Sequence, residues 1–206
     1  MGGSAVTTHD YRYSEEKHEY YIDGGRVPNV TEILGTLCFF HFKDNPDALS
    51  FGKAMHKTIN LWERGLLDGD ILDPSLEGGL ESYQKWKDAT GFKYAGGEIP
   101  MYHANQPRFG GTPDLFGRDA RGSLCLPDLK TGNAQKWTAA QTAGYALLLR
   151  AHFDLPATIP ILRFALEIQK TGKIAIAKPY PVTQNILDEA AFLSCASTWW
   201  WRERYK

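Results

Sequence analysis

The chain has 206 residues, of which 43% are hydrophobic and 23% charged, so its composition is that of a globular protein long enough for one substantial core. A formal net charge of −1 excludes nucleic-acid binding through a global excess of positive charge, and any such surface must be local. Three scattered cysteines without a Cys-x-x-Cys pair argue against a disulfide framework, a zinc ribbon or an iron–sulfur cluster, and we expect them to be small buried side chains.

The first half of the chain predicts a hairpin followed by helices. Tyrosines and Ile22 on either side of the turn-forming Asp23-Gly24-Gly25 indicate a hairpin over residues 11–31, and residues 30–34 favour a short helical turn. Asp44-Asn45-Pro46 signals a helix start, and apolar residues at helical spacing define the inward face of that helix: Met55, Ile59, Trp62 and Leu66. A second helix over 76–89 is expected to turn Leu80, Tyr83 and Trp86 inward.

From Phe92 the pattern changes to strands, which turn signals divide into 93–104, 107–118 and 123–130. Thr138 is expected to cap a buried helix that ends near His152. Two alternating strands, 161–168 and 173–180, precede a last helix over 183–203 whose inward face should carry Ile186, Ala190, Leu193 and Trp200. Trp199, Trp200 and Trp201 point in different directions on a helix, so one or two should pack against the core. The order predicts an α/β fold with a mixed β-sheet flanked by helices.

Two aspartates carry the chemical signal of this sequence. Asp114 and Asp128 each occupy a Pro-Asp-Leu sequence within an apolar run, and Lys130 follows two residues after the second. A half-buried carboxylate in a strand is costly unless a cation meets it, and a metal ion is the obvious candidate. Because side chains alternate along a strand, residues 128 and 130 should share a face, with the Leu129 carbonyl between them as a further ligand. This pattern predicts phosphodiester hydrolysis assisted by one or two Mg²⁺ or Mn²⁺ ions, with Lys130 beside the attacking water or the phosphate.

Asp114, the Asp128-Leu129-Lys130 triplet and the helical Gln141-x-x-x-Tyr145 resemble the PD-(D/E)XK nuclease superfamily. The likeness is greatest to its RecB-like branch, which includes phage recombination exonucleases and mitochondrial genome-maintenance exonucleases. Upstream, Gly52-Lys53-Ala54-Met55-His56 is similar to the family's Gly-x-x-x-His helix, and Val27-Pro28-Asn29-Val30-Thr31 to its Pro-Ser-Val-Thr segment. Glu98 precedes Asp114 much as a family glutamate precedes the Gly-Thr-x-Asp strand.

The resemblance implies a restriction-endonuclease-like αβββαβ core over residues 46–206, with an N-terminal hairpin and helical extension over 1–45, in a single nuclease domain over 1–206. It implies that Asp114, Asp128 and the Leu129 carbonyl bind the catalytic metal and that His56 completes or extends the metal site. Lys130 is then the catalytic lysine, and Gln141 and Tyr145 shape the site or contact DNA. Some branches hold an iron–sulfur cluster through four cysteines, which this chain does not provide.

Simpler interpretations stand beside these assignments. His56 adjoins the inward face of its helix, so a core or interface histidine is the plain alternative, and Glu98 could be a charge at a strand end rather than a second metal-binding carboxylate. Candidate DNA-binding residues flank the expected cleft, and each could equally be an ordinary surface residue: Thr131, Arg108, Lys136 and Trp137, besides Gln141 and Tyr145. An aromatic ring beside a cation, as in Lys136-Trp137, suits stacking on unpaired bases.

These observations lead us to expect a metal-dependent deoxyribonuclease, an exonuclease that acts on single- or double-stranded DNA ends in phage or bacterial recombination or repair and leaves 5′-phosphates. Two alternatives stay open: a non-cleaving module that binds DNA or a recombination partner protein, and a site-specific endonuclease. No run of residues reaches the about 20 apolar positions needed to span a bilayer, and the N-terminus has no signal-peptide core. We therefore expect a cytoplasmic protein of a bacterial or phage-infected cell with no membrane partner.

Overall fold

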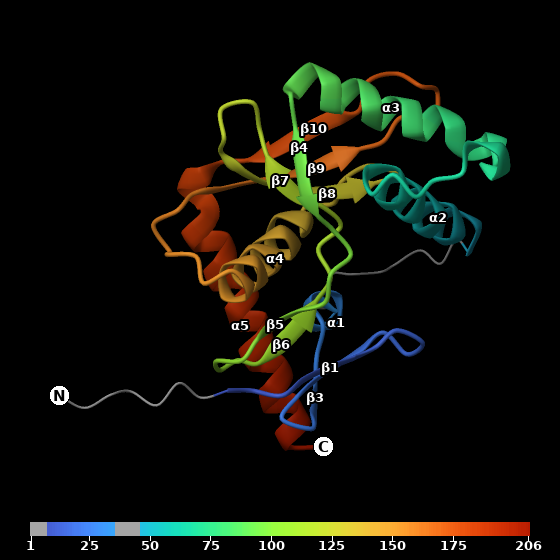
Figure 1. Ribbon diagram of the computed structural model, residues 1–206. Coiled ribbons are helices and arrows are strands. Elements are labelled where there is room, and N and C mark those ends of the chain that lie inside the picture. Colours follow the sequence, from blue (N-terminus) through green and yellow to red (C-terminus); the bar gives the residue numbers. More distant parts are fainter. Residues whose placement is uncertain (1–7, 36–45) are drawn as a thin grey trace.

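The computed structural model describes residues 8–35 and 46–206, and it has a mixed β-sheet flanked by helices, as predicted (Figure 1). Cys38 and the first two residues of the expected helix start at 44–46 lie outside the described residues. Cys125 and Cys195 are buried, as expected of small apolar side chains. Within the described ranges, no helix has the length and apolar character that a membrane crossing requires.

The N-terminal segment is a three-stranded antiparallel sheet, so the prediction of a single hairpin was incomplete. Its strands follow one another in the chain: β1 (Tyr11–Ser14), β2 (Glu19–Ile22) and β3 (Gly25–Val27). The turn at Asp23-Gly24 is the predicted one, and both residues have positive φ, which glycine adopts at little cost. The turn at 15–18 was missed because it contains no glycine or proline. The short helix α1 (Val30–Leu34) follows as predicted, and the Asn29 side chain accepts the Glu32 backbone N–H at its start.

Two helices, α2 (Pro46–Glu63) and α3 (Pro74–Thr90), pack together over one face of the main sheet, and the 3-10 turn η1 (Gly69–Ile71) lies between them (Figure 1). Met55 and Ile59 are fully buried, as the helical spacing predicts. Leu66 is exposed, contrary to prediction, because α2 ends at Glu63 and the chain turns at Gly65. The predicted α3 stripe of Leu80, Tyr83 and Trp86 is buried.

The main sheet has the strand order β10-β9-β8-β7-β4, in which only β8 and β9 run parallel. Its strands are β4 (Lys93–Gly96), β7 (Phe116–Arg118), β8 (Leu124–Lys130), β9 (Ile161–Glu167) and β10 (Ile176–Tyr180). The helix α4 (Thr138–His152) makes the crossover from β8 to β9. A parallel pair needs such a crossover, and residues 141–146, Leu148 and Leu149 of this helix are buried, whereas its last two residues are exposed.

The predicted strands 93–104 and 107–118 are each broken in the middle. The C-terminal part of the first and the N-terminal part of the second form a separate two-stranded sheet of β5 (Met101–His103) and β6 (Phe109–Gly111). Each break contains a proline, Pro100 or Pro113, which cannot donate a ladder hydrogen bond. Asp114 consequently lies in the bend between β6 and β7, not in a strand as predicted. Residues 97–100 connect the main sheet to the two-stranded sheet, and residues 112–115 connect it back.

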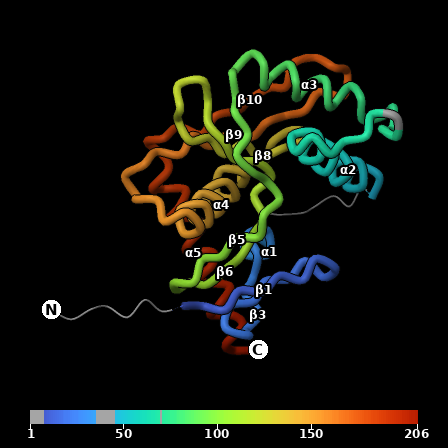
Figure 2. Tube along the Cα trace, in the orientation of Figure 1, coloured from blue at the N-terminus to red at the C-terminus, as the bar shows by residue number. Residues whose placement is uncertain are grey.

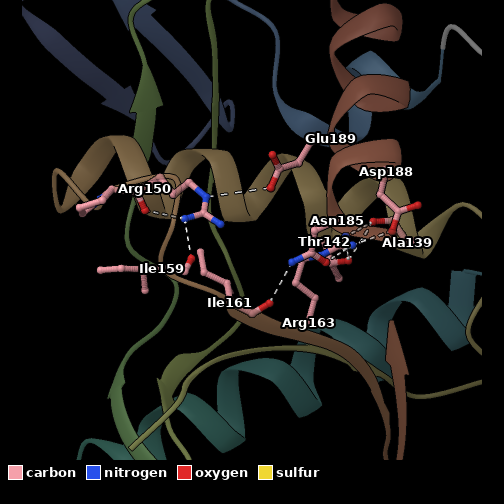
Figure 3. A network of polar contacts seen from close by, with 10 residues as sticks. Ala139, Thr142, Arg150, Ile159, Ile161, Arg163, Asn185, Asp188 and Glu189 are labelled. Carbon is pink, nitrogen blue, oxygen red and sulfur yellow. Dashed lines mark hydrogen bonds and ion pairs between the residues drawn. The ribbon is translucent and has the colours of Figure 1, made fainter. Parts of the chain in front are cut away.

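The opposite face of the main sheet is covered by α4 and by α5 (Asn185–Arg204), which follows the 3-10 turn η2 (Val182–Gln184). A network around the buried Arg163 of β9 joins the three elements (Figure 3). Its guanidinium donates to Asn185 and Asp188 of α5 and to the Ala139 carbonyl and Thr142 hydroxyl of α4. The predicted cap at Thr138 was wrong, because α4 begins at this residue and no side chain caps it.

The buried face of α5 differs from the predicted one. Ile186 and Ala190 are exposed, whereas Phe192, Cys195, Ala196 and Trp199 are buried. Both sets have helical spacing, and the face with the large Phe192 ring is the one that packs against Phe109. Trp200 is half-buried against the N-terminal sheet, and its Nε1 donates to the Arg108 carbonyl, while Trp201 is exposed. The tube view shows this sheet beside the C-terminal half of α5 (Figure 2).

Candidate functional site

The end of β8 supplies the centre of the candidate site. Asp128 and Lys130 lie on the same side of the strand, as predicted, and the Lys130 Nζ is 2.5 Å from Asp128 Oδ2. This side faces α4, where Gln141 Oε1 accepts a hydrogen bond from Lys130 Nζ at 3.1 Å. The Lys130 ammonium also lies 5.9 Å from the centre of the Trp137 ring. Lys130 is therefore held by a carboxylate and an amide oxygen beside an aromatic ring.

Asp114 is fixed to the same strand through its carboxylate. The Leu129 N–H donates to Asp114 Oδ2 at 2.7 Å, which ties the bend after β6 to the strand that carries Asp128. The backbone of this bend is held as well, because the Glu98 N–H donates to the Pro113 carbonyl at 2.8 Å. Asn60 of α2 donates to the Asp114 carbonyl at a longer 3.4 Å. The two segments that connect the sheets, 97–100 and 112–115, are therefore hydrogen-bonded to each other next to Asp114.

Helix α2 brings His56 to this carboxylate. His56 Nδ1 lies 3.3 Å from Asp114 Oδ1, and the imidazole is about three-quarters buried, with 24% of the side chain exposed. The helix approaches the end of β8 closely at Gly52, where an added Cβ would lie 3.3 Å from the Thr131 hydroxyl. The glycine of the Gly-x-x-x-His segment therefore has a packing role one helical turn before the histidine.

Glu98 completes a group of three metal-type ligands. The ligand atoms of His56, Glu98 and Asp114 all lie within 4.8 Å of one another. Glu98 has a φ of 54°, a left-handed conformation that costs a residue with a side chain free energy and clusters at functional sites. The neighbouring Gly97 cannot be replaced easily, since an added Cβ would lie 2.2 Å from the Asp114 carbonyl oxygen.

The two aspartates have opposite electrostatic environments. Burial raises the pKa of Asp128 to about 6, although the Lys130 ammonium opposes this effect. Burial would also raise the pKa of Asp114, but His56, Lys130 and the Leu129 N–H outweigh it, and the pKa is lowered. For His56 the balance is reversed: burial alone would lower its pKa, and the charge of Asp114 raises it above the usual value. Burial likewise opposes the charge of Lys130, but Asp128 and Asp114 raise the lysine pKa, so the group is an ammonium.

Glu98 is exposed as a residue, but its carboxyl group is partly removed from solvent. Although the residue as a whole is exposed, burial of the carboxyl group among its neighbours and then the charge of Asp114 raise the pKa of Glu98. Two carboxylates that approach each other in this way favour a bound cation, because the cation lowers the cost of ionising both.

The chemistry of these donors fits a divalent cation. His56, Glu98 and Asp114 offer one nitrogen and two oxygens, a donor set that suits Mn²⁺ and, through its carboxylates, Mg²⁺. Asp128 is only 2% exposed, and neither of its carboxylate oxygens has a well-formed hydrogen bond within the described residues, although Oδ2 contacts Lys130. A buried carboxylate with an uncommitted oxygen is costly unless a further cation or donor joins it.

The structure brings some predicted metal ligands together and separates others. His56, Glu98 and Asp114 form one cluster, whereas Asp128 is committed to Lys130 and does not belong to that cluster. The Leu129 N–H, not its carbonyl, makes the contact with Asp114 that the structure describes. The roles of Asp128 and of the Leu129 carbonyl as metal ligands remain predictions.

The predicted DNA-binding residues are spread over three regions. Gln141 and Tyr145 are buried, and they lie in the wall of the site beside Lys130 and Asp114. Lys136 is exposed, and Thr131 and Trp137 are half-buried, in the loop after β8. Arg108 directly precedes β6, away from the other candidates. It forms an ion pair with Asp23 of the N-terminal β2–β3 turn and donates to the Ala104 carbonyl. DNA contact by these residues stays a prediction.

Sequence reasoning missed two residues that position the site. Asn60 is four residues after His56 and shares its helix face, so the helical spacing was a usable signal. Gly97 directly precedes Glu98, and a glycine beside a candidate ligand indicates a close backbone approach.

A scan against models of known protein families finds no match to this chain. A search of curated proteins likewise finds no relative.

Proposed function

We propose that this protein is a metal-dependent DNA nuclease of the PD-(D/E)XK type, and that it acts as an exonuclease on DNA ends in phage or bacterial recombination or repair. The observation that carries the proposal is the convergence of His56, Glu98 and Asp114, with ligand atoms within 4.8 Å, directly beside the Lys130–Asp128 pair. A hydrogen bond from Leu129 to Asp114 joins the two groups into one site.

The order of elements supports the proposal. A helix pair precedes three antiparallel strands, and α4 then crosses over to the parallel strand β9, an order compatible with an αβββαβ nuclease core. The candidate residues gather where β8 ends and α4 begins, and the bend at Asp114 reaches the same place. The strand interruptions that contain Pro100 and Pro113 support this arrangement, because the segments that they create carry Glu98 and Asp114.

His56, Glu98 and Asp114 would hold the ion. Asp128 is close enough to Asp114 for the charge of Asp114 to contribute to its raised pKa. A bound Mg²⁺ or Mn²⁺ supplies an activated water and charge stabilisation for phosphodiester hydrolysis. The protein's own contribution is the Lys130 ammonium, which Asp128 and Gln141 hold in place to offset the negative charge of a phosphate. The charges of Asp128 and Asp114 raise the pKa of Lys130 and so favour its ammonium form, which suits charge stabilisation.

The test is incubation of end-labelled linear DNA, single- and double-stranded, and of a closed circular plasmid with Mg²⁺, Mn²⁺ or EDTA. Lys130→Ala protein serves as the control for contaminating nuclease. We expect metal-dependent loss of linear DNA with the circle spared, 5′-phosphate products and no activity in EDTA or in the variant. Discrete fragments from the circle would instead indicate a site-specific endonuclease. Binding without cleavage under every metal condition would favour a non-cleaving module.

A further inference from the structure

Helix α2 and the residue after it carry a row of exposed cations on the side of the molecule where His56 emerges. Arg64 directly follows the last helical residue, Glu63, and its N–H still donates to the Asn60 carbonyl, so it continues the helical path. Lys53, Lys57 and Arg64 are all exposed, and we call these three residues the α2 stripe. Their spacing of four and seven residues places them on one face of the helix, the face that also presents His56 and Asn60. A row of like charges along one helix face costs stability through mutual repulsion, which a bound polyanion would relieve.

This face borders a cavity of about 460 Å³ that opens beside the candidate site. The stripe forms one side of the cavity, and Glu15 of the β1–β2 turn belongs to its lining too. His56 and Glu98 contribute both to the cavity lining and to the cluster of metal-type ligands. A ligand that lies along the stripe therefore reaches the candidate metal site without a break.

The dimensions suit a nucleic-acid strand. From Lys53 to Arg64, the residue directly after the helix, the chain rises about 16 Å, since each helical residue adds 1.5 Å. This length matches several successive phosphates of one strand, which are spaced about 3.4 Å apart along a duplex. The chain as a whole has a formal net charge of −1, so a local concentration of cations is the way in which it can attract a polyanion.

We infer that the α2 stripe binds the DNA backbone on the approach to the scissile phosphate, with Lys53, Lys57 and Arg64 each contacting phosphate oxygens. This inference rests on the proposed function for its choice of DNA as the ligand. Contacts to phosphates fix the position of a strand and carry no sequence information. The stripe thus serves an enzyme that acts on DNA ends regardless of their sequence.

The experiment measures binding by fluorescence anisotropy in EDTA, so that cleavage does not interfere. The probes are a short labelled single-stranded oligonucleotide and its duplex. The test protein is Lys53→Ala/Lys57→Ala/Arg64→Ala, and the charge-matched control is Lys93→Ala/Arg118→Ala/Arg121→Ala. The control residues are exposed at the opposite end of the main sheet, where β4 begins and β7 turns into β8. Thermal melting checks that both variants are folded.

We expect the stripe variant to bind about tenfold or more weakly than wild type, and the control variant within about twofold of wild type. The slope of log K against log salt is negative, and its magnitude should fall by about two in the stripe variant, because each lost phosphate contact removes about 0.7 to 0.9 from it. Equal affinities and equal slopes for the two triple variants, on both probes, overturn the inference.

Glu15 provides a test with the opposite sign. Its carboxylate belongs to the lining of the same cavity, so Glu15→Gln should tighten DNA binding about two- to threefold at low salt. A gain of affinity cannot be explained by misfolding. Weaker or unchanged DNA binding by this variant would contradict our inference that the DNA strand lies in this cavity along the α2 stripe.

The outcomes separate this inference from the proposed function. Loss of binding in the stripe variant, together with a wild-type protein that does not cleave DNA with any metal, supports the stripe and refutes the nuclease. Cleavage by the wild type, together with a stripe variant that binds as the control does, supports the nuclease and refutes the stripe.

Discussion

Two clusters of buried charge lie side by side on the α4 face of the main sheet, and they differ in how completely their polar atoms are paired. Arg163 on β9 is 1% exposed, and all three of its guanidinium nitrogens donate to oxygens of α4 and α5 (Figure 3). Asp128 on the neighbouring β8 is 2% exposed, and among the described residues its carboxylate has an ion pair with Lys130 but no well-formed hydrogen bond. In strand register the two residues are two positions apart, from the pair Leu126–Arg163 to the pair Asp128–Ala165.

This difference teaches how to tell a structural charge from a functional one. A buried charge that is fully hydrogen-bonded holds elements together, and here it joins β9 to two helices. A buried charge that keeps an uncommitted oxygen next to a cluster of ligand-type side chains costs stability, and proteins retain such a charge where another partner is to bind. Four predictions test this contrast.

The largest effect is expected at the ligand cluster. Asp114→Ala should lower the rate of metal-dependent DNA cleavage more than about 10³-fold, because it removes a proposed metal ligand and the acceptor of the Leu129 N–H. Single-turnover cleavage of end-labelled DNA measures the effect. Asp88→Ala, which changes an exposed aspartate of α3, is the matched control and should cleave as the wild type does. Near-normal cleavage by Asp114→Ala would remove this residue from the site.

The Arg163 network should show the opposite behaviour. Arg163→Met should lower the free energy of unfolding by about 3–5 kcal/mol, because Asp188 and Asn185 lose their partner in a buried setting. Urea denaturation measures the loss, and Arg121→Met on the exposed β7–β8 turn is the control. The fraction that stays folded should cleave DNA at a normal rate. A stable Arg163→Met protein with impaired cleavage would reverse our assignment of structural and functional charges.

His56 should affect the metal more than the fold. His56→Ala should raise the Mn²⁺ concentration needed for half-maximal cleavage by about 10- to 100-fold, since one of the three proposed ligands is lost. His152→Ala, an exposed histidine at the end of α4, is the control. An unchanged metal titration would leave His56 as a packing residue that merely contacts Asp114.

The smallest effect concerns Glu167, which pairs with Lys178 at 2.6 Å and accepts the Ala134 N–H of the loop after β8. Burial opposes its ionisation, but these two donors prevail and lower the pKa of Glu167. A depressed folded-state pKa gives stability that is present above the unfolded-state pKa, about 4.3, and is lost as pH falls through the folded-state value.

Glu167→Gln should therefore unfold about 1 kcal/mol more easily than wild type at pH 7, and this difference should shrink as pH falls below about 4. Denaturation at a series of pH values checks the sign. A difference that grows toward low pH would contradict the lowered pKa.

Much of the fold could be predicted from the sequence where a single apolar stripe dominates a helix. The stripe of Leu80, Tyr83 and Trp86 in α3 is of this kind. In α5, two stripes of similar apolar character compete, and the choice depends on the Phe109 ring that receives Phe192. Such a contact between distant segments leaves no local pattern in the sequence.

The candidate site could be predicted as a set of residues but not as an arrangement. The motif spacing picked out His56, Glu98 and Asp114, which the fold brings together. It also placed Asp114 in a strand, and the bend at Pro113 changed which groups its carboxylate can meet. The separation of Asp128 from the cluster depends on that bend, so only three-dimensional geometry reveals it.

The double passage of the chain between the two sheets has a mechanical consequence. Residues 97–100 and 112–115 are the two direct covalent links between the main sheet and the β5–β6 sheet, and they carry Glu98 and Asp114. The ion that we propose would be held by both links and by His56 on α2, so it would connect three separate elements at this point. Loading of that ion would therefore limit movement of the β5–β6 sheet relative to the main sheet, in addition to any role in chemistry.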